Sequence, residues 1–270
     1  MRKAEGKRQK AEGRRQKAES RAGTAFAILL AIVLAVIPPL ALLAQSAAPP
    51  NITGAWVPFN AGRGADPAVA PPAPGPIVLK PPYAQQYEAR RQADAEATKR
   101  GEPPVSDAVL CSPYGMPRMM AVATYPVEFL QTAGQITIVT EAFSEVRRVF
   151  MDQPQQPIDE VPPGYYGHSV GRWESGTLVI DTVGIKTTVP GYQNIPHSDQ
   201  VRIGERIRVV APDVLHDQIT ITDPVVLEKP VVYTLAYRRM PGYKMVEFVC
   251  ENNREYVDEQ GKVRMRLRGR

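Results

Sequence analysis

Hydrophobic and polar residues alternate in short runs over most of residues 105–256, and these runs are rich in Val, Ile and Thr. Alternation with a period of two predicts β-strands that bury one face, and the Gly, Pro, Asp and Ser residues between the runs are typical of turns. The expected strands are residues 119–124, 127–132, 135–141, 145–151, 177–183, 201–210, 215–222, 231–239 and 244–250.

Two short connections predict how these strands pair. Residues 142–144 and 211–213 have the composition of hairpin turns, so neighbouring strands should run antiparallel. No segment with helical periodicity separates the strands, which excludes a doubly wound α/β sheet. The sequence therefore predicts a mainly β fold over residues 105–258: an antiparallel meander that forms a lipocalin-like barrel or a two-sheet sandwich.

A proline-rich arm and a short helix precede this β-rich domain, within residues 49–104. Prolines and glycines break residues 49–82 into extended chain, although residues 51–56 (NITGAW) have the pattern of a chain that joins a β-structure. Residues 83–99 contain helix formers throughout but few apolar positions, so we expect one N-terminal surface helix. Residues 259–270 form a basic tail, which is either an edge strand or a frayed end.

The first 48 residues have the organisation of an export signal. Residues 1–24 are a basic leader built on a seven-residue repeat (KAEGKRQ, KAEGRRQ, KAESRAG), which is either a disordered arm or the product of a mis-assigned translation start. Residues 25–48 begin with an almost wholly apolar run and end in small residues, which is typical of a cleaved signal peptide. The alternative is an uncleaved N-terminal anchor in the inner membrane. Both predict a periplasmic or secreted bacterial protein.

The net positive charge of the chain belongs to this leader. The chain carries 33 Lys and Arg against 28 Asp and Glu, with a pI of about 9.2. The first 48 residues hold nine of the basic and three of the acidic residues, so the rest has 24 basic and 25 acidic ones. A near-neutral body lacks the basic face that nucleic-acid binding needs. We expect a small-molecule partner, no nucleic acid, and membrane contact only through residues 25–44 if the signal is not cleaved.

Cys111 and Cys250 are the only two cysteines, and they lie near the two ends of the β-rich region. Two remaining thiols usually pair in an oxidising compartment, so we expect a disulfide; two buried free thiols are the alternative. Such a bond would restrict the unfolded chain and stabilise the fold by ~4–5 kcal/mol.

Residues 167–171 (GHSVG) match the nucleophile elbow of serine hydrolases. That elbow needs a buried strand before its serine and a helix after it, whereas a proline-rich loop precedes Ser169 and another strand follows. The order Ser169, Asp181, His197 suits a catalytic triad, but no βα unit separates them. We interpret the motif as the glycine-lined start of a strand that ends in a tight turn at residues 175–176.

Two carboxylates fall on apolar strand faces. Glu205 alternates in phase with Ile203 and Ile207, and Asp217 does so with Ile219 in the next strand. A carboxylate that points into a β-barrel is costly unless it is paired, hydrogen-bonded or protonated. Each is therefore either part of a buried pair or a group that binds a ligand or acts as an acid or base.

Histidines follow the two longest loops. Residues 152–166 lead into His168, and residues 184–196 lead into His197. A histidine beside a carboxylate titrates near neutrality, which suits general acid–base catalysis. No histidine spacing is typical of a metal site, so no metal and no cofactor are expected. The candidate catalytic residues are His197, Asp199, Glu205 and Asp181.

Several stretches together resemble a widespread family of exported, uncharacterised bacterial proteins. They are C-x-P-x-G-M-P-R-M from Cys111, PVEFLQTAGQITIVTE, GHSVGRWESGTLVIDTVG, PHSDQVRIGERIRV and DQITITDP, and the likeness spans residues 51–257. The resemblance implies the fold and export, and no reaction. The family often has an acidic residue at the position of His168 and Gly-Asp at residues 175–176, which argues against catalysis by His168. The polar positions that match the family are Trp173, Glu174, Asp181, His197, Glu205 and Arg206.

Three functions are consistent with these features. The first is an exported β-barrel protein that binds a small, largely apolar molecule, because a meander with a few inward polar groups is typical of a ligand cavity. The second is an extracytoplasmic lyase, isomerase or hydrolase that uses general acid–base residues at strand ends. The third is a structural or adaptor protein of the cell envelope. The candidate ligand-binding residues are Trp173, Glu174, Arg206 and His168.

Overall fold

The computed structural model describes residues 48–59, 67–102, 104, 107–122, 125–250 and 255–265. The predicted leader, and all but the last residue of the predicted signal peptide or anchor, lie outside the described residues. Within these ranges, none of the helices combines the length and apolar character that a membrane crossing requires.

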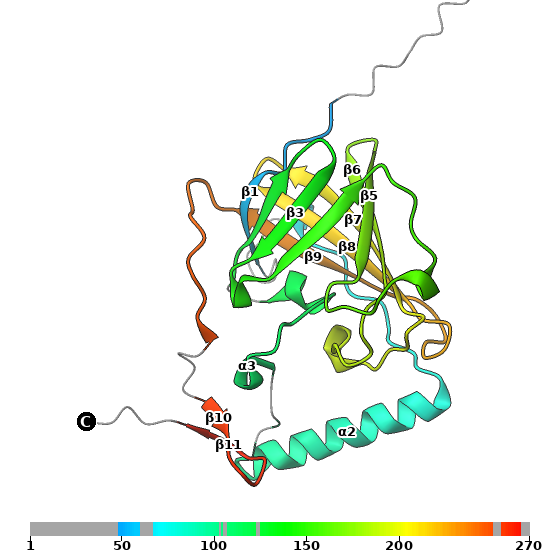
Figure 1. The fold of residues 1–270 in the computed structure, drawn as a ribbon, viewed down its shortest axis with the longest axis vertical. Helices are drawn as coiled ribbons and strands as arrows, with labels where there is room; N and C mark the ends of the chain where they lie inside the picture. Colours follow the sequence, from blue (N-terminus) through cyan, green and yellow to red (C-terminus); the bar gives the residue numbers. More distant parts are fainter. Residues whose placement is uncertain are drawn as a thin grey trace, which may run out of the picture. The chain divides into compact units, whose positions relative to one another are not determined.

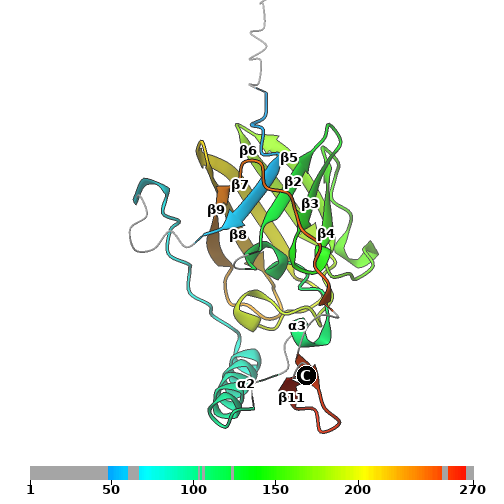
Figure 2. The ribbon, with the colours of Figure 1, turned by 90° about the vertical axis from the view of Figure 1, so that its left-hand side faces the viewer.

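A closed barrel of nine strands, in sequence order, forms the body of the protein (Figure 1). The barrel closes where β1 pairs with both β2 and β9 (Figure 2). The predicted barrel is confirmed, and the two-sheet sandwich is not formed. The strands are β1 (Gly54–Pro58), β2 (Val127–Gln131), β3 (Gln135–Thr140), β4 (Val146–Met151), β5 (His168–Glu174), β6 (Thr177–Val183), β7 (Arg202–Ala211), β8 (Val214–Thr222) and β9 (Val231–Arg239).

The alternating pattern closes the barrel because it gives each strand one apolar face. In β3, for example, Ile136 and Ile138 are buried while Gln135 and Thr137 are partly exposed. The inward side chains form one continuous core. Its largest fully buried members include Trp56, Phe129 and Tyr237. Small barrels are filled by such side chains rather than open through the middle.

One pair of strands departs from the meander. β4 and β5 run parallel, with Val149 opposite Ser169 and Met151 opposite Gly171, whereas we expected antiparallel neighbours throughout. The connection between them covers residues 152–167 and contains η4 (Ile158–Glu160), so it is long enough to return the chain to the starting end of β4. The predicted hairpins at η3 (Ala142–Ser144) and between β7 and β8 are both formed.

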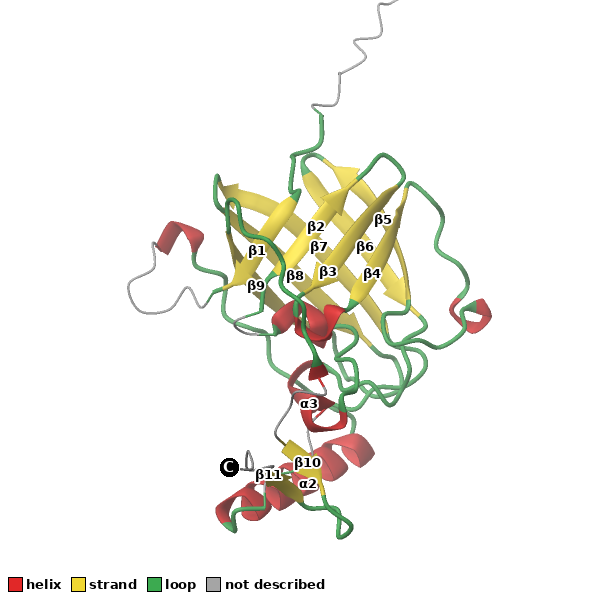
Figure 3. Cartoon of the chain, turned by 60° about the vertical axis from the view of Figure 1, so that its left-hand side comes forward, coloured by secondary structure: helices red, strands yellow, loops and turns green. Residues whose placement is uncertain are grey.

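Two expected strands are not strands. Residues 119–121 of the first lie within η2 (Arg118–Ala121), where Met119 and Met120 are buried in the core, and residues 123–124 lie outside the described residues. Residues 244–250 form an irregular segment after β9 (Figure 3). Glu141 accepts hydrogen bonds from the Tyr243 hydroxyl and the Val246 amide, so this segment is fixed to the η3 turn rather than to a strand.

The predicted surface helix is confirmed as α2 (Pro81–Lys99), which buries none of its residues. Its start is anchored by the Lys80 amide, which donates to Val226 O at 2.9 Å. The arm before it includes η1 (Pro67–Val69), and α3 (Asp107–Leu110) precedes the first core turn. Part of the tail forms an edge strand: β11 (Val263–Met265) pairs with β10 (Glu255–Val257), and residues 266–270 lie outside the described residues.

The predicted disulfide joins Cys111 to Cys250, whose Cα atoms are 5.7 Å apart. It connects the end of α3 to the end of the segment that follows β9, across a sequence separation of 139 residues. No free cysteine is found among the described residues.

Candidate functional site

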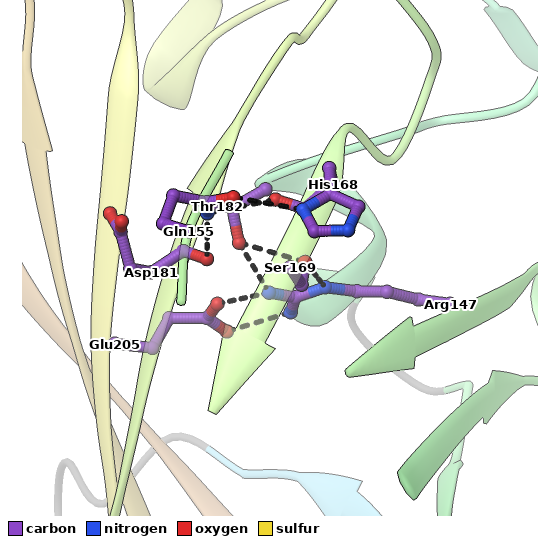
Figure 4. Close-up of polar contacts among 7 residues, drawn as sticks. All are labelled: Arg147, Gln155, His168, Ser169, Asp181, Thr182 and Glu205. Atoms are coloured by element: carbon purple, nitrogen blue, oxygen red, sulfur yellow. Dashed lines mark hydrogen bonds and ion pairs between the residues drawn. The ribbon is translucent and has the colours of Figure 1, made fainter. Parts of the chain in front are cut away.

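A buried ion pair crosses the barrel interior (Figure 4). Arg147 on β4 donates through Nη1 to Glu205 Oε1 on β7 at 2.9 Å, and its Nη2 contacts Glu205 Oε2. The same guanidinium donates through Nε to Ser169 Oγ at 3.1 Å and through Nη2 to Thr182 Oγ1 at 2.9 Å. The side chains of Arg147 and Glu205 are 1% and 0% exposed. The bidentate contact with Glu205 and the two hydroxyl oxygens together accept hydrogen bonds from every nitrogen of the guanidinium. Such hydrogen bonding offsets the cost of removing two charges from water.

The strand pattern explains how these four side chains meet. Each occupies an inward position, and Ser169 lies directly opposite Thr182 in the β5–β6 pair, with 2.8 Å between their hydroxyl oxygens. Gly171, the next inward residue of β5, has no side chain, and a Cβ there would lie 2.7 Å from Val149 Cγ1. The interior beside the ion pair is therefore closely packed.

Asp217 on β8 is the one buried side chain, among the described residues, whose oxygens lack a hydrogen-bond partner. It is fully buried and faces the same interior. Burial raises the pKa of this carboxyl well above its usual value of 3.8, and the negative charge of Glu205 raises it further, while Arg147 opposes the shift. The side chain therefore favours its neutral, proton-bearing form.

Two tyrosines of β9 face this carboxyl. Burial, followed by the charges of Asp217 and Glu205, raises the pKa of both Tyr233 and Tyr237 well above its usual value. The Tyr237 hydroxyl donates to Met120 O at 2.5 Å. The ring of Tyr233 stacks on Tyr192, with 3.8 Å between centroids and 12° between planes.

Tyr192 belongs to the loop that closes this end of the barrel. The loop covers residues 184–197 and contains η5 (Tyr192–Asn194). Gln193 and Asn194 have φ angles of 51° and 60°, which are uncommon outside glycine. The loop is fixed from outside by the Tyr87 hydroxyl of α2, which donates to Gln193 O at 2.8 Å.

His197 ends the loop and is engaged by the backbone. Its Nε2 lies 2.8 Å from Val189 O and its Nδ1 lies 3.0 Å from Ser198 O. Asp223 then fixes the following turn, because it accepts hydrogen bonds from both the amide and the hydroxyl of Ser198. His197 therefore ties two parts of the loop to each other, and Asp223 ties the end of the loop to the residue that follows β8.

An apolar cavity lies between this loop and the ends of β7 and β8. It leaves about 10 Å³, which is room for one water molecule. Its apolar wall comes from the barrel and the loop together, and His197 and Asp223 supply its polar groups. The apolar side chains are those of Met116, Pro117, Ile185, Ile195, Pro196, Val201, Ile203, Ile221 and Leu227.

The four candidate catalytic residues occupy three separate places. Glu205 lies inside the barrel in the ion pair. Asp181 lies on the outer face of β6, where it pairs with Arg202 at 2.9 Å. His197 lies in the loop at the barrel end, and Asp199 is exposed just after it. The structure does not bring these residues together, so their shared catalytic role stays a prediction.

The candidate ligand-binding residues divide in a similar way. Glu174 and Arg206 contact each other on the outer surface, 3.3 Å apart, and Trp173 packs against the core. Trp173 and Glu174 are adjacent on β5, so their side chains point to opposite faces. His168 stacks on Phe150, with 5.4 Å between ring centroids, and its Nδ1 lies 2.8 Å from Gln155 Oε1 (Figure 4). The four residues therefore form no single binding site.

Ser169 sits inside β5, buried and hydrogen-bonded to Thr182 and Arg147. A nucleophile elbow would expose this serine on a strand-to-helix turn. The interpretation of GHSVG as a strand start is therefore confirmed.

Sequence reasoning missed Arg147, Tyr192 and Tyr233. Arg147 is one of two adjacent arginines, and alternation does not tell which of the two faces inward. Tyr192 is a loop aromatic with no periodic signal. Alternation in residues 231–239 does place Tyr233 and Tyr237 on one face, which was the available indication that both are internal.

No family model matches the chain, and no curated protein matches it either. Among the described residues, no group of three or more His, Cys, Asp and Glu side chains is arranged to hold a metal ion.

Proposed function

We propose that this chain is an exported β-barrel protein that binds a small, largely apolar molecule at the barrel end closed by residues 184–197. The observation that carries the proposal is the stack of Tyr192 on Tyr233 above the unpartnered, buried carboxyl of Asp217. Tyr192 occupies the place of a planar ligand, and a ligand ring takes over its stacking contact when the loop opens.

The depth of the proposed site follows from the register of β8. Ile221, Ile219 and Asp217 are its successive inward positions from the loop end, and Tyr233 lies opposite Ile219. At a rise of about 3.3 Å per residue, Asp217 lies ~13 Å inside from Ile221. A ligand that enters past Ile221 therefore meets apolar walls first, then the face of Tyr233, and last the carboxyl.

These groups define the ligand by its chemistry. Stacking on Tyr233 favours a flat aromatic ring. The Asp217 oxygens are buried without a hydrogen-bond partner, and they can accept a hydrogen bond from a hydroxyl or amine at the inner end of the ligand. This bond removes the free-energy cost of leaving a buried polar group unpaired. A mostly apolar body with one terminal polar group fits both requirements.

Two features support an extracytoplasmic location. The Cys111–Cys250 disulfide is a bond that persists in oxidising compartments and is rare in a reducing cytoplasm. The basic leader and apolar run of the first 48 residues have the order of a signal peptide. We propose that the barrel works in the periplasm or outside the cell, either free or held by its N-terminus.

The binding proposal is tested with 2-naphthol, which combines a flat apolar ring with one hydroxyl. Titration is followed by fluorescence and by thermal shift on the wild type, Tyr192→Ala, Tyr233→Ala and Asp217→Leu. Tyr256→Ala serves as the matched control, since Tyr256 is exposed on β10. We expect saturable binding that is about tenfold tighter in Tyr192→Ala, because the competing ring is gone.

The other variants separate the parts of the site. Tyr233→Ala should abolish the saturable signal, and Asp217→Leu should remove the preference for 2-naphthol over naphthalene. Equal binding by the wild type and Tyr233→Ala, or no saturation by Tyr192→Ala, would disprove the site.

A second candidate function, general acid–base catalysis in the same interior, is favoured by the raised pKa of Asp217. A carboxyl that keeps its proton above its usual range is suited to act as an acid on a bound molecule. Acid–base catalysis would be supported if the wild type turned over a compound from a metabolite panel and Asp217→Asn lost this turnover but still bound 2-naphthol. Turnover unchanged in Asp217→Asn would remove Asp217 from the mechanism.

A further inference from the structure

We propose a second binding site on the outer face of the barrel, beneath the proline-rich arm, that takes a small hydroxylated anion bearing a carboxylate or a phosphate. It lies on the opposite side of the β7–β9 wall from the interior site and is independent of it. The observation behind it is a polar cavity of about 200 Å³ that carries two arginines and no acidic side chain. Its lining is Pro72, Thr177, Arg206, Arg208, His216, Gln218 and Thr234.

The strand register builds the floor of this cavity. Arg206 lies opposite Gln218 in the β7–β8 pair, and Arg208 lies opposite His216. Gln218 in turn lies opposite Thr234 on β9. These residues alternate with inward ones, so their side chains project from the same outer face into one patch of hydrogen-bonding groups.

The arm forms the roof and is anchored on both sides of Pro72. Before it, Val69 O accepts a hydrogen bond from His216 Nε2 at 2.9 Å. After it, the Gly75 amide donates to Val232 O at 2.7 Å, and a Cβ on Gly75 would lie 3.2 Å from that oxygen. A side chain at position 75 would therefore fit only if the neighbouring backbone moved by a few tenths of an ångström. The cavity is therefore a fixed space between two anchor points.

The two arginines of the cavity favour a negatively charged ligand. Arg206 forms an ion pair with Glu174, with 3.3 Å between Nη1 and Oε2. Glu174 also forms a second, closer ion pair with Arg172. Arg208 forms no ion pair with any residue in the part of the chain that the structure describes. A guanidinium presents several N–H donors in one plane and pairs with carboxylate or phosphate through two parallel hydrogen bonds. Arg208 is therefore the principal anion contact, and Arg206 assists it.

The remaining groups favour hydroxyls on the same ligand. A carbonyl oxygen only accepts, so the Nε2 of His216 carries the hydrogen, and the Nδ1 of a neutral ring is then an acceptor. Gln218, Thr177 and Thr234 each both donate and accept. A sugar acid or a sugar phosphate combines one anionic group with several hydroxyls in a molecule of suitable size.

Isothermal titration of the full chain at low ionic strength tests this site. The ligands are glucuronate and glucose 6-phosphate, with neutral glucose and inorganic phosphate as the two partial ligands. We expect saturable binding of at least one of the first two, at least tenfold tighter than either partial ligand. Whichever binds more tightly identifies carboxylate or phosphate as the anionic group.

The variants are Arg208→Gln and a matched control, Arg202→Gln, which removes an arginine from the same outer face of β7 outside the cavity. Arg208→Gln should weaken binding at least tenfold, and Arg202→Gln should change it less than twofold. Equal losses in both variants, or no saturable binding of either sugar anion, would overturn the proposal. Tyr192→Ala should leave this binding unchanged, so the outcome is read separately from that for the interior site.

Discussion

Asp217 on β8 and Glu205 on β7 both face the barrel interior, two positions apart in the strand register, and only Glu205 has hydrogen-bond partners. Glu205 is held by a bidentate guanidinium, whereas both oxygens of Asp217 are buried and unpaired. Because the Arg147 guanidinium is paired with Glu205, burial and the charge of Glu205 prevail at Asp217 and raise the pKa of its carboxyl.

The first prediction concerns pH. The folded protein holds the proton of Asp217 above pH 3.8, where the unfolded chain releases it, so folding takes up a proton and stability falls as pH rises. Asp217→Asn has no proton to lose and should therefore be more stable than the wild type. Its advantage should grow by up to about 1.4 kcal/mol per pH unit above pH 4. Urea unfolding of both proteins from pH 4 to pH 8 measures this difference in stability. A difference that does not vary with pH would contradict the prediction.

The second prediction concerns the Arg147–Glu205 pair. Arg147→Met leaves the Glu205 carboxylate buried without its cation, which should cost about 3–5 kcal/mol of stability. The double variant Arg147→Met, Glu205→Leu removes both charges and should be more stable than Arg147→Met alone. Chemical denaturation of the single and double variants checks this. A double variant that is no more stable than the single one would show that the pair is not the dominant contact.

The third prediction concerns packing at β5. Gly171→Ala places a Cβ 2.7 Å from Val149 Cγ1 and 3.1 Å from Met151 Sδ, so these buried side chains must shift. We expect a loss of about 1–3 kcal/mol. Gly134→Ala is the control, since a Cβ there meets nothing within 4 Å. Thermal unfolding compares the two variants, and equal melting temperatures would contradict the close packing.

The fourth prediction concerns the disulfide. Replacing Cys111 and Cys250 with serine frees a loop of about 140 residues in the unfolded state and should lower stability by ~4–5 kcal/mol. Because the bond lies outside the barrel strands, far-UV circular dichroism below the transition should stay unchanged. Denaturation of wild type with and without reductant provides an independent measurement. Unaltered stability in both experiments would refute the loop-entropy account.

Alternation predicted most strands because each barrel strand buries one face. It failed for β5, where the inward positions are Ser169 and Gly171, small or polar residues that give no apolar period. It also predicted a strand from residue 119, where the structure has the short helix η2, because periodicity does not separate a short helix from a strand in an apolar run such as Met119 and Met120.

The candidate site was predicted less well, because it depends on contacts between distant segments. The inward position of Glu205 followed from alternation, but its partner Arg147 lies three strands away across the barrel. The loop residue Tyr192 meets Tyr233 only after the barrel has formed. The parallel β4–β5 pair likewise depends on the path of a long connection, which composition does not specify.

The closure of the barrel by β1 and β9 has a consequence for biosynthesis. Gly54–Pro58 needs both Val127–Gln131 and Val231–Arg239 as partners, so one edge of this early strand stays open until most of the chain has been made. Pairing between such remote segments is slow, and unpaired strand edges promote aggregation in the meantime. A chain that ends before residue 231 can form at most a sheet with two free edges, so the barrel closes only after β9 has joined β1.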